Sequence, residues 1–207
     1  MIDADAKRGV FALGVSLFFI SCAGIGSWVQ RSHCPVVPVP TSDLPDDIEL
    51  RGRMHLSMEN GEAHFEVVAR RVPEELVVVG IAQYGVRLFA VHQRGREIAV
   101  EGAPSREFAH LARWTLDALH RAIWISTPSD AGAGPVVDWS WENESVTESI
   151  DGGQRRREFV HPDASDPVVI RYLSPPAEAG DRVEIQNPWC GYEATLVVVD
   201  TPERVVE

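Results

Sequence analysis

A succession of short segments in which apolar and polar residues alternate is the feature that most constrains the fold of this chain. Residues 48–58 alternate in this way, and a period of two residues is typical of a strand with one buried face. Asn60-Gly61 follows, a pair that favours a two-residue hairpin turn because both turn positions need positive φ. Residues 63–69 then form the returning strand, and connections this short predict antiparallel pairing.

The same pattern continues along the rest of the chain. Turn residues such as Gln83-Tyr84-Gly85, Arg94-Gly95 and Asp151-Gly152-Gly153 separate the segments. We expect further strands at residues 76–81, 86–92, 97–100, 136–141, 145–150, 155–160, 168–173, 182–186 and 192–199. About ten strands predict a mainly β chain with one or two helices, folded as an open antiparallel sheet or a barrel.

One helix interrupts the strands, and we expect it at residues 105–125. Ser105 suits the N-cap position, and Glu107 lies in the first turn, where an acidic residue is favourable. Pro128 follows the segment and cannot continue a helix. Apolar residues recur at helical spacing and form one stripe: Phe108, Leu111, Ala112, Leu116, Leu119 and Ile123.

Cys22 ends an apolar run that lies behind Lys7 and Arg8, an arrangement typical of an export signal. Phe19-Ile20-Ser21-Cys22 resembles the lipobox of bacterial lipoproteins, so we expect residues 1–21 to be a signal peptide and Cys22 to carry lipid. Ala23 after the cysteine implies, by the sorting rule of such lipoproteins, the outer membrane, with the domain facing the periplasm. The alternative is an uncleaved helical anchor, because residues 10–29 contain no charged residue and about 20 apolar residues can span a bilayer.

Behind the lipidated end, residues 22–47 contain a proline-rich linker, and the globular domain is expected at 48–200 with a tail at 201–207. The chain carries a net charge of −12. Such a surface argues against nucleic acid, whose phosphates need a basic partner, and against electrostatic docking onto anionic lipid. We therefore expect the acyl chains to attach the protein to the membrane. We also expect a monomer.

Cys34 and Cys190 remain after Cys22 is assigned to lipidation. In an oxidising compartment two such cysteines are candidates for a disulfide, and the alternative is two free thiols, one of them in the linker. His33 beside Cys34 lacks the spaced ligand pairs of a tetrahedral zinc site. We expect no metal and no cofactor.

The sequence contains no motif that indicates catalysis. A Gly-x-Ser-x-Gly elbow, a His-Glu-x-x-His pair and a phosphate-binding glycine loop are all missing from it. The histidines are scattered among strands and helix and suggest no triad: His55, His64, His92, His110, His120 and His161. We therefore expect a protein that is not an enzyme.

The run Arg155–Arg157 predicts the exposed edge of a hairpin, where charge discourages aggregation.

Laid out in this way, the chain resembles the LolA/LolB superfamily of lipoprotein carriers, over roughly residues 48–200. Leu76–Phe89 resembles a strand–turn–strand of LolB, Leu116–Trp124 resembles its lid-helix segment, and Gly180–Ile185 a late strand of that fold. Val183–Asn187 followed by Gly191-Tyr192 is also similar to a family of bacterial lipoproteins encoded near aryl-polyene or fatty-acid-like synthesis genes. The resemblance implies an open antiparallel β half-barrel whose concave apolar face is covered by a helical lid.

The resemblance also implies a function, the binding of an acyl-bearing molecule such as a lipoprotein, lipid or polyene. The tip of the LolB turn, which assists delivery to the membrane, corresponds to Tyr84; the alternative is an ordinary turn tyrosine packed against its neighbours. One parity of each strand should line the ligand site, or simply fill the core: Phe65, Val67, Val78, Leu88, Trp139, Trp141, Ile170 and Tyr172. A second functional hypothesis is a scaffold lipoprotein of an envelope assembly without a ligand cavity.

Overall fold

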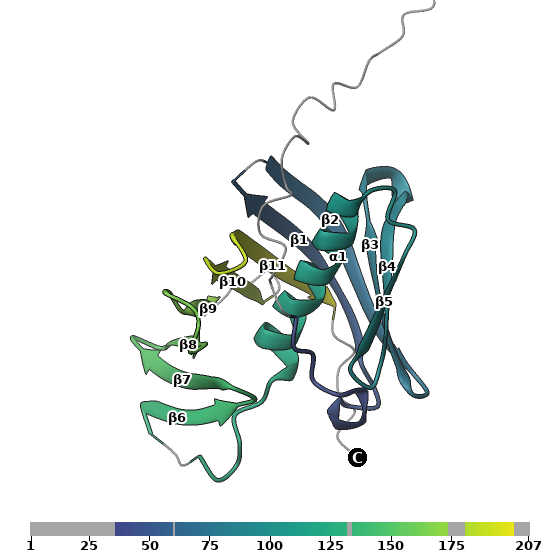
Figure 1. Cartoon of the computed structure of the whole chain (residues 1–207). Coiled ribbons are helices and arrows are strands. Elements are labelled where there is room, and N and C mark those ends of the chain that lie inside the picture. Colours follow the sequence, from purple (N-terminus) through teal and green to yellow (C-terminus); the bar gives the residue numbers. More distant parts are fainter. Residues whose placement is uncertain (1–35, 60, 132–133, 174–180, 201–207) are drawn as a thin grey trace, which may run out of the picture.

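The computed structural model describes residues 36–59, 61–131, 134–173 and 181–200 (Figure 1). The predicted signal peptide, Cys22 and Cys34 lie outside the described residues. Among the residues that are described, no helix is both long and apolar enough to cross a membrane.

Eleven antiparallel strands form one open sheet, in the spatial order β5-β4-β3-β2-β1-β11-β10-β9-β8-β7-β6 (Figure 1). The chain runs outward from the central β1 to the edge strand β5, crosses the sheet through its helix to the other edge, and returns strand by strand to β11. The bounds are β1 (Glu49–Met58), β2 (Gly61–Val72), β3 (Glu75–Ile81), β4 (Arg87–Arg94), β5 (Glu97–Glu101), β6 (Val136–Trp141), β7 (Glu144–Asp151), β8 (Gln154–Val160), β9 (Val168–Leu173), β10 (Arg182–Asn187) and β11 (Tyr192–Asp200).

These strands confirm the mainly β, open antiparallel prediction. Asn60 is not among the described residues, but Met58 pairs with Gly61, as the predicted hairpin requires. The sheet is not closed into a barrel, because β5 and β6 stand at its two ends. The architecture is an open half-barrel with a helix against one face.

The alternation of the sequence sorts the side chains onto two faces. Met54 and Leu56 on β1 are buried on the face that carries the helix, which we call the inner face, while their neighbours Arg53 and His55 point to the outer face. Across the sheet, Met54 lies between Phe65 on β2 and Leu196 on β11. Inner-face residues of successive strands therefore form continuous apolar rows.

Gly80 on β3 has a packing role in one of these rows. It lies across from Phe89, and a Cβ at this glycine would come within 2.4 Å of the Phe89 ring. The ring therefore packs directly against the backbone of β3, edge to face with Phe65 at 5.6 Å between centroids. A side chain at position 80 would displace it.

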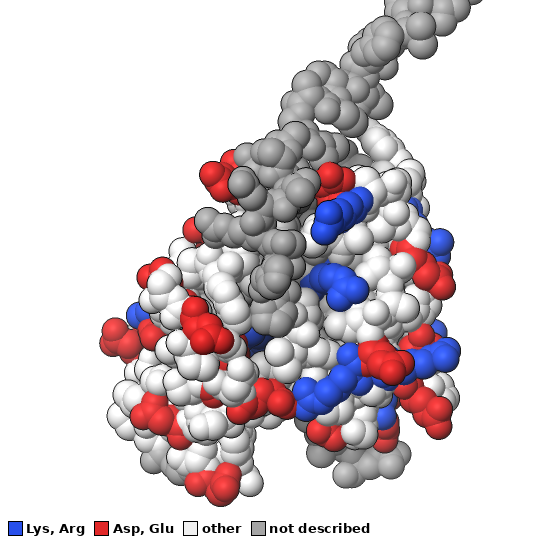
Figure 2. Space-filling view, viewed as in Figure 1, with Lys and Arg blue, Asp and Glu red and all other residues white. Residues whose placement is uncertain are grey.

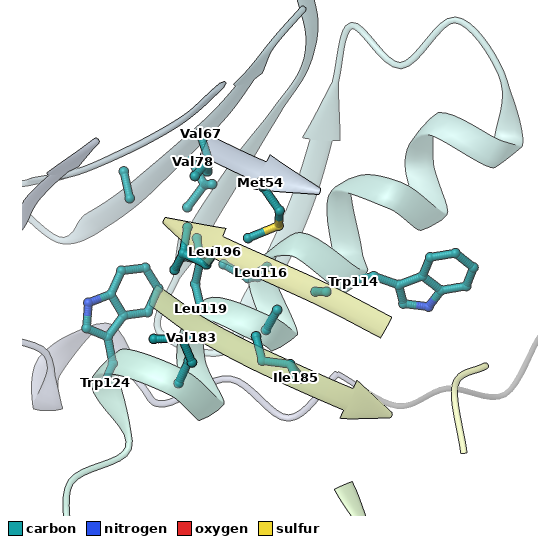
Figure 3. Close-up of a cluster of buried hydrophobic side chains, with 14 of the residues drawn as sticks. Met54, Val67, Val78, Trp114, Leu116, Leu119, Trp124, Val183, Ile185 and Leu196 are labelled. Atoms are coloured by element: carbon teal, nitrogen blue, oxygen red, sulfur yellow. The ribbon is translucent and has the colours of Figure 1, made fainter. Parts of the chain in front are cut away.

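The predicted helix is present as α1 (Arg106–Leu119), which continues without a break into one π-helical turn, η4 (His120–Trp124). Ser105 occupies the predicted N-cap position. Leu116 and Leu119 are wholly buried against the sheet, as the apolar stripe predicts. Figure 3 shows them facing Met54, Val183 and Leu196 across the centre of the core.

Burial of the helical segment extends well beyond this stripe. From Trp114 to Trp124 only Ile123 is more than 9% exposed, so the second half of the segment is enclosed on all sides. Asp117 and Arg121 are among the enclosed residues. The π-helical turn was not predicted from the sequence. Such turns occur frequently at functional sites.

Candidate functional site on the inner face of the sheet

The inner face falls into two parts, which differ in chemistry. Beneath α1, the strands β1 to β4 and β9 to β11 present mainly apolar side chains, the buried core of the protein (Figure 3). Towards the edge strand β6, the inner face of β6, β7 and β8 presents aromatic, acidic and arginine side chains. We call this second part, together with Tyr172 on the neighbouring β9, the aromatic–arginine end, and define it by Trp139, Trp141, Arg155, Arg157 and Tyr172.

The eight residues predicted to line a ligand site are distributed over both parts. Phe65, Val67, Val78 and Ile170 are at most 5% exposed and belong to the packed core. Leu88 is partly buried and points to the outer face of β4. The inner face of this strand carries Phe89 and Val91, which pair with Gly80 and Val78. The remaining three, Trp139, Trp141 and Tyr172, are half-buried at the aromatic–arginine end. Of the eight predicted residues, only these three aromatic ones lie together at a partly exposed part of the inner face.

A buried ion-pair network fixes the helical segment to the sheet. Arg121, on η4, binds Asp117 one turn earlier through Nε at 3.0 Å. Its two terminal nitrogens donate to both oxygens of Glu144 on β7, at 2.6 and 3.1 Å. Bidentate pairing of this kind is the strongest geometry available to a guanidinium. All three side chains are at most 3% exposed.

The second oxygen of Asp117 also has partners in the core. Tyr192 donates its hydroxyl to this atom at 2.9 Å, and Asn187 donates its amide at 3.3 Å. Burial raises the pKa of Tyr192 well above its ordinary value, and the Asp117 charge raises it further. Burial opposes the charge of Arg121, but Asp117 and Glu144 outweigh it and raise the pKa of the guanidinium. Arg121 is therefore held in its charged form by the two carboxylates.

A second network lies beside the first and contradicts one prediction. The run Arg155–Arg157 is not an exposed hairpin edge, because β8 lies inside the sheet between β7 and β9. Arg157 is 1% exposed. Its parity places it on the inner face with Phe159, two residues along, so the strand alternation overrides the polarity of the residue. Arg156, between Arg155 and Arg157, faces outward and is exposed.

Glu148 is the centre of this second network. Its Oε2 accepts hydrogen bonds from Arg155 at 2.7 Å, from Arg157 at 2.6 and 3.0 Å, and from Thr127 at 3.0 Å. Burial works against the Glu148 charge, but the hydrogen bonds from the two arginines prevail and lower the pKa of this carboxyl. Counted with Asp117, Arg121 and Glu144, the two networks contain three acidic and three basic side chains and so balance their charges.

Arg157 also joins the helical segment to the sheet. Its Nη1 donates to the backbone carbonyls of Ile125 at 2.6 Å and Arg121 at 3.3 Å. Tyr172 donates its hydroxyl to the carbonyl of Ala122 at 2.8 Å. The last carbonyls of a helix have no partner within the helix and carry its negative dipole end, so a guanidinium is favourable here. The C-terminal end of the helical segment is thus held by β8 and β9.

Aromatic rings cover the arginines of both networks. The guanidinium of Arg155 lies 4.6 Å from the centre of the Tyr172 ring, and that of Arg157 lies 5.5 Å from the Trp139 ring. Arg121 lies 4.9 Å from the ring of Phe159. These distances are within the range of cation–π attraction. The aromatic–arginine end therefore combines flat aromatic surfaces with arginines whose charges are already paired with carboxylates.

Tyr84, the predicted tip residue, lies in the turn between β3 and β4. Its side chain is 99% exposed, so it does not pack against its neighbours. The backbone of Tyr84 is left-handed, with φ of 67°, a conformation that is unusual for a residue other than glycine. Val86, two residues on, is 60% exposed. The turn therefore presents two apolar side chains to solvent.

Cys190, the one cysteine among the described residues, lies in the turn between β10 and β11. It is buried and disulfide-bonded, and its backbone N–H donates to Asn187 Oδ1 at 2.9 Å. Because Cys34 lies outside the described residues, the pairing of Cys34 with Cys190 stays a prediction.

The fold and this inner face define a class: an open antiparallel half-barrel whose concave side is covered by a helix anchored through buried ion pairs. Residues 49–200 match the model of a family described as "Protein of unknown function (DUF3261)", and the chain belongs to this family. No curated protein matches the chain.

Proposed function

We propose that the protein is a lipid-anchored carrier or receptor for an acyl-bearing molecule, held to the outer membrane through Cys22 with its domain in the periplasm. The half-barrel would hold the apolar part of a lipid, a lipoprotein or a polyene. The proposal rests mainly on one observation, the half-buried rings of Trp139, Trp141 and Tyr172 on the inner face near the β6 edge of the sheet. The strands β6 to β8 at this edge extend beyond α1 (Figure 1). Burial of a chain there would contribute about 0.8 kcal/mol for each CH₂ removed from water.

The networks restrict how the helical lid could move. Arg121 and Arg157 fix its C-terminal half, and releasing them would expose paired charges at considerable cost. The N-terminal end, from Arg106 to His110, is only partly buried. We therefore propose that the lid movement needed for handoff is confined to this first turn and the segment before it, while the second half of the helix stays in place.

The exposed turn at Tyr84 supports the same proposal. An amphipathic side chain on a protruding turn suits the interface of a membrane. The position of Tyr84 also resembles the tip that assists delivery in LolB. Tyr84 would then meet the membrane or the cargo during transfer.

The packed core favours the second hypothesis, a scaffold without a cavity. Val67, Val78, Leu116 and Leu119 are wholly buried, so the region directly beneath α1 is filled by the protein's own side chains. A scaffold of an envelope assembly would need no more than this.

Native mass spectrometry of the full protein, extracted from membranes, separates the two hypotheses. A stoichiometric bound lipid or polyene supports the carrier, and the protein should also take up a fluorescent fatty acid. Trp139→Glu should abolish uptake while the circular dichroism spectrum is retained. Trp189→Glu, at a half-buried tryptophan in the β10–β11 turn, is the matched control and should leave uptake unchanged. A mass without ligand and no fatty-acid uptake would exclude the carrier and leave the scaffold.

A further inference from the structure

Two histidines and a glutamate meet on the outer face of the sheet, on the side opposite α1. His55 on β1 lies directly across from His64 on β2. Their rings are stacked, with centroids 4.0 Å apart and planes 4° from parallel. Glu62 precedes His64 by two residues and so shares its face. Along the chain the histidines are nine positions apart, so only the β1–β2 register brings them together.

The distances between the donor atoms fit a metal ion. Glu62 Oε2 lies 3.4 Å from His55 Nε2 and 3.6 Å from His64 Nε2. Zinc binds such nitrogens and oxygens at about 2.0–2.2 Å in a tetrahedron, which places neighbouring ligand atoms about 3.4 Å apart. All three donor atoms lie within 4.8 Å of one another. Because a ring nitrogen binds a metal in the plane of its ring, a single ion can reach all three once one imidazole turns out of the stack.

The nitrogen of His55 that faces this point has no competing partner. Among the described residues, Nε2 of His55 makes no hydrogen bond, although the atom itself is buried. The Glu62 oxygen is near it but is not aligned as a hydrogen-bond acceptor. A ring nitrogen without a hydrogen bond, with a carboxylate and a second imidazole beside it, is the donor set that suits zinc, copper and nickel better than magnesium or calcium.

The surroundings favour a cation and leave room for further ligands. Glu62 and Glu193 lie on either side of Ser57 in the sheet, so another carboxylate stands one strand beyond β1. A cleft of about 290 Å³ opens beside His55, lined in part by His55, Ser57 and Glu193. Three protein ligands with an open side leave a position for water or for a group from another molecule.

We propose that His55, Glu62 and His64 form a binding site for one divalent transition-metal ion, with Zn²⁺ as its occupant. The site lies on the outer face and does not depend on ligand binding at the inner face. A bound ion would also join the middle of β1 to the start of β2.

Zinc titration of the full, untagged protein after dialysis against a chelator tests the site. Isothermal titration should show one Zn²⁺ per chain, and Co²⁺ in its place should give the intense visible bands of a four-coordinate ion. His64→Gln and Glu62→Gln should each weaken Zn²⁺ binding at least tenfold, and His55→Gln/His64→Gln should abolish it. The imidazole NMR signals of His55 and His64 should shift when Zn²⁺ is added.

His92→Gln is the matched control. His92 is also on the outer face, but its nitrogens face two different carboxylates, Glu75 at 2.8 Å and Glu101 at 3.6 Å, which do not converge on one point. Its replacement should leave Zn²⁺ affinity unchanged. If the wild type binds no Zn²⁺, or if the double variant binds it as tightly as the wild type, the site does not exist as proposed.

Discussion

Arg96, in the turn between β4 and β5, forms an ion pair with Glu142, in the turn between β6 and β7. These turns belong to opposite edges of the sheet. Adjacent strands are rotated by about 20–25°, and over ten strand pairs this accumulates to about 200° or more. The ion pair shows that the twisted sheet also curls far enough to bring these two turns together. The inner face is bounded there by an ion pair instead of by the hydrogen bonds of a closed barrel.

Arg96→Ala should loosen these edges with little effect on global stability. Both side chains are more than a third exposed, and exposed pairs contribute about 0.2–1 kcal/mol. The free energy of unfolding should fall by less than about 1 kcal/mol, while amide hydrogen exchange quickens at β5 and β6. Exchange in the central strands β1 and β11 should not change.

The reversed pair Arg96→Glu/Glu142→Arg is the control for this experiment. It restores opposite charges and should return exchange at the edges towards the wild-type rate. Edge exchange that is equal in all three proteins would show that the ion pair does not hold the edges.

Arg121→Met should be severely destabilising. It leaves Asp117 and Glu144 buried without their cation, and breaking a buried pair in this way costs about 3–5 kcal/mol. Urea denaturation followed by circular dichroism measures the loss. Arg113→Met, on the exposed side of the same helix, should change stability by no more than about 0.5 kcal/mol. Equal effects of the two substitutions would contradict the role assigned to the network.

The strands and the helix could be predicted because their signals are local. Each strand is indicated by alternation over five to twelve residues, and each hairpin is indicated by its turn residues, such as Asn60-Gly61. The helix stripe placed Leu116 and Leu119 against the sheet in the same way. The long-range pairing of β1 with β11 has no comparable local signal, and alternation alone does not distinguish an open sheet from a barrel.

The buried charges could not be predicted from polarity alone. Arg121 and Glu144 are 23 positions apart, and nothing in either segment indicates the other. Two weaker signals were present: Asp117 and Arg121 have the i, i+4 spacing of a helical ion pair, and Arg157 shares the parity of Phe159. The parity of Arg157 indicated an inward position, whereas the spacing of Asp117 and Arg121 indicated a pair but not its burial.

His120 should make stability depend on pH. It is wholly buried, with its Nε2 2.8 Å from Gln93 Oε1 and its Nδ1 accepting from the N–H of Val39. Burial, aided by the charge of Arg121, lowers the pKa of His120 to about 3. Between that value and about 6.5 the unfolded chain binds a proton that the folded protein does not. The contribution of neutral His120 to the free energy of unfolding is therefore fully present above about pH 6.5. Below that pH the free energy of unfolding falls, by up to about 1.4 kcal/mol per pH unit.

Urea denaturation at pH 7 and pH 5 measures this dependence, since most carboxylates are still ionised at pH 5. His120→Gln cannot bind the proton and should show a smaller fall in stability between the two pH values. Burial also lowers the pKa of His110, which adds a dependence of the same sign, so the comparison is between the variant and the wild type. Equal slopes for the two proteins would assign the dependence to other groups.

Tyr84→Gly should separate the function of the turn from its folding. Glycine adopts the left-handed backbone of this position without strain, which contributes about 1 kcal/mol, but it also gains freedom in the unfolded chain, which opposes that effect. The free energy of unfolding should therefore change by less than about 1 kcal/mol. If the exposed ring contacts the membrane, the transfer of a fluorescent fatty acid from protein to phospholipid vesicles should slow markedly. Tyr84→Trp keeps an amphipathic ring at the tip and should retain the wild-type rate, whereas an unchanged rate in the glycine variant would remove Tyr84 from the proposed mechanism.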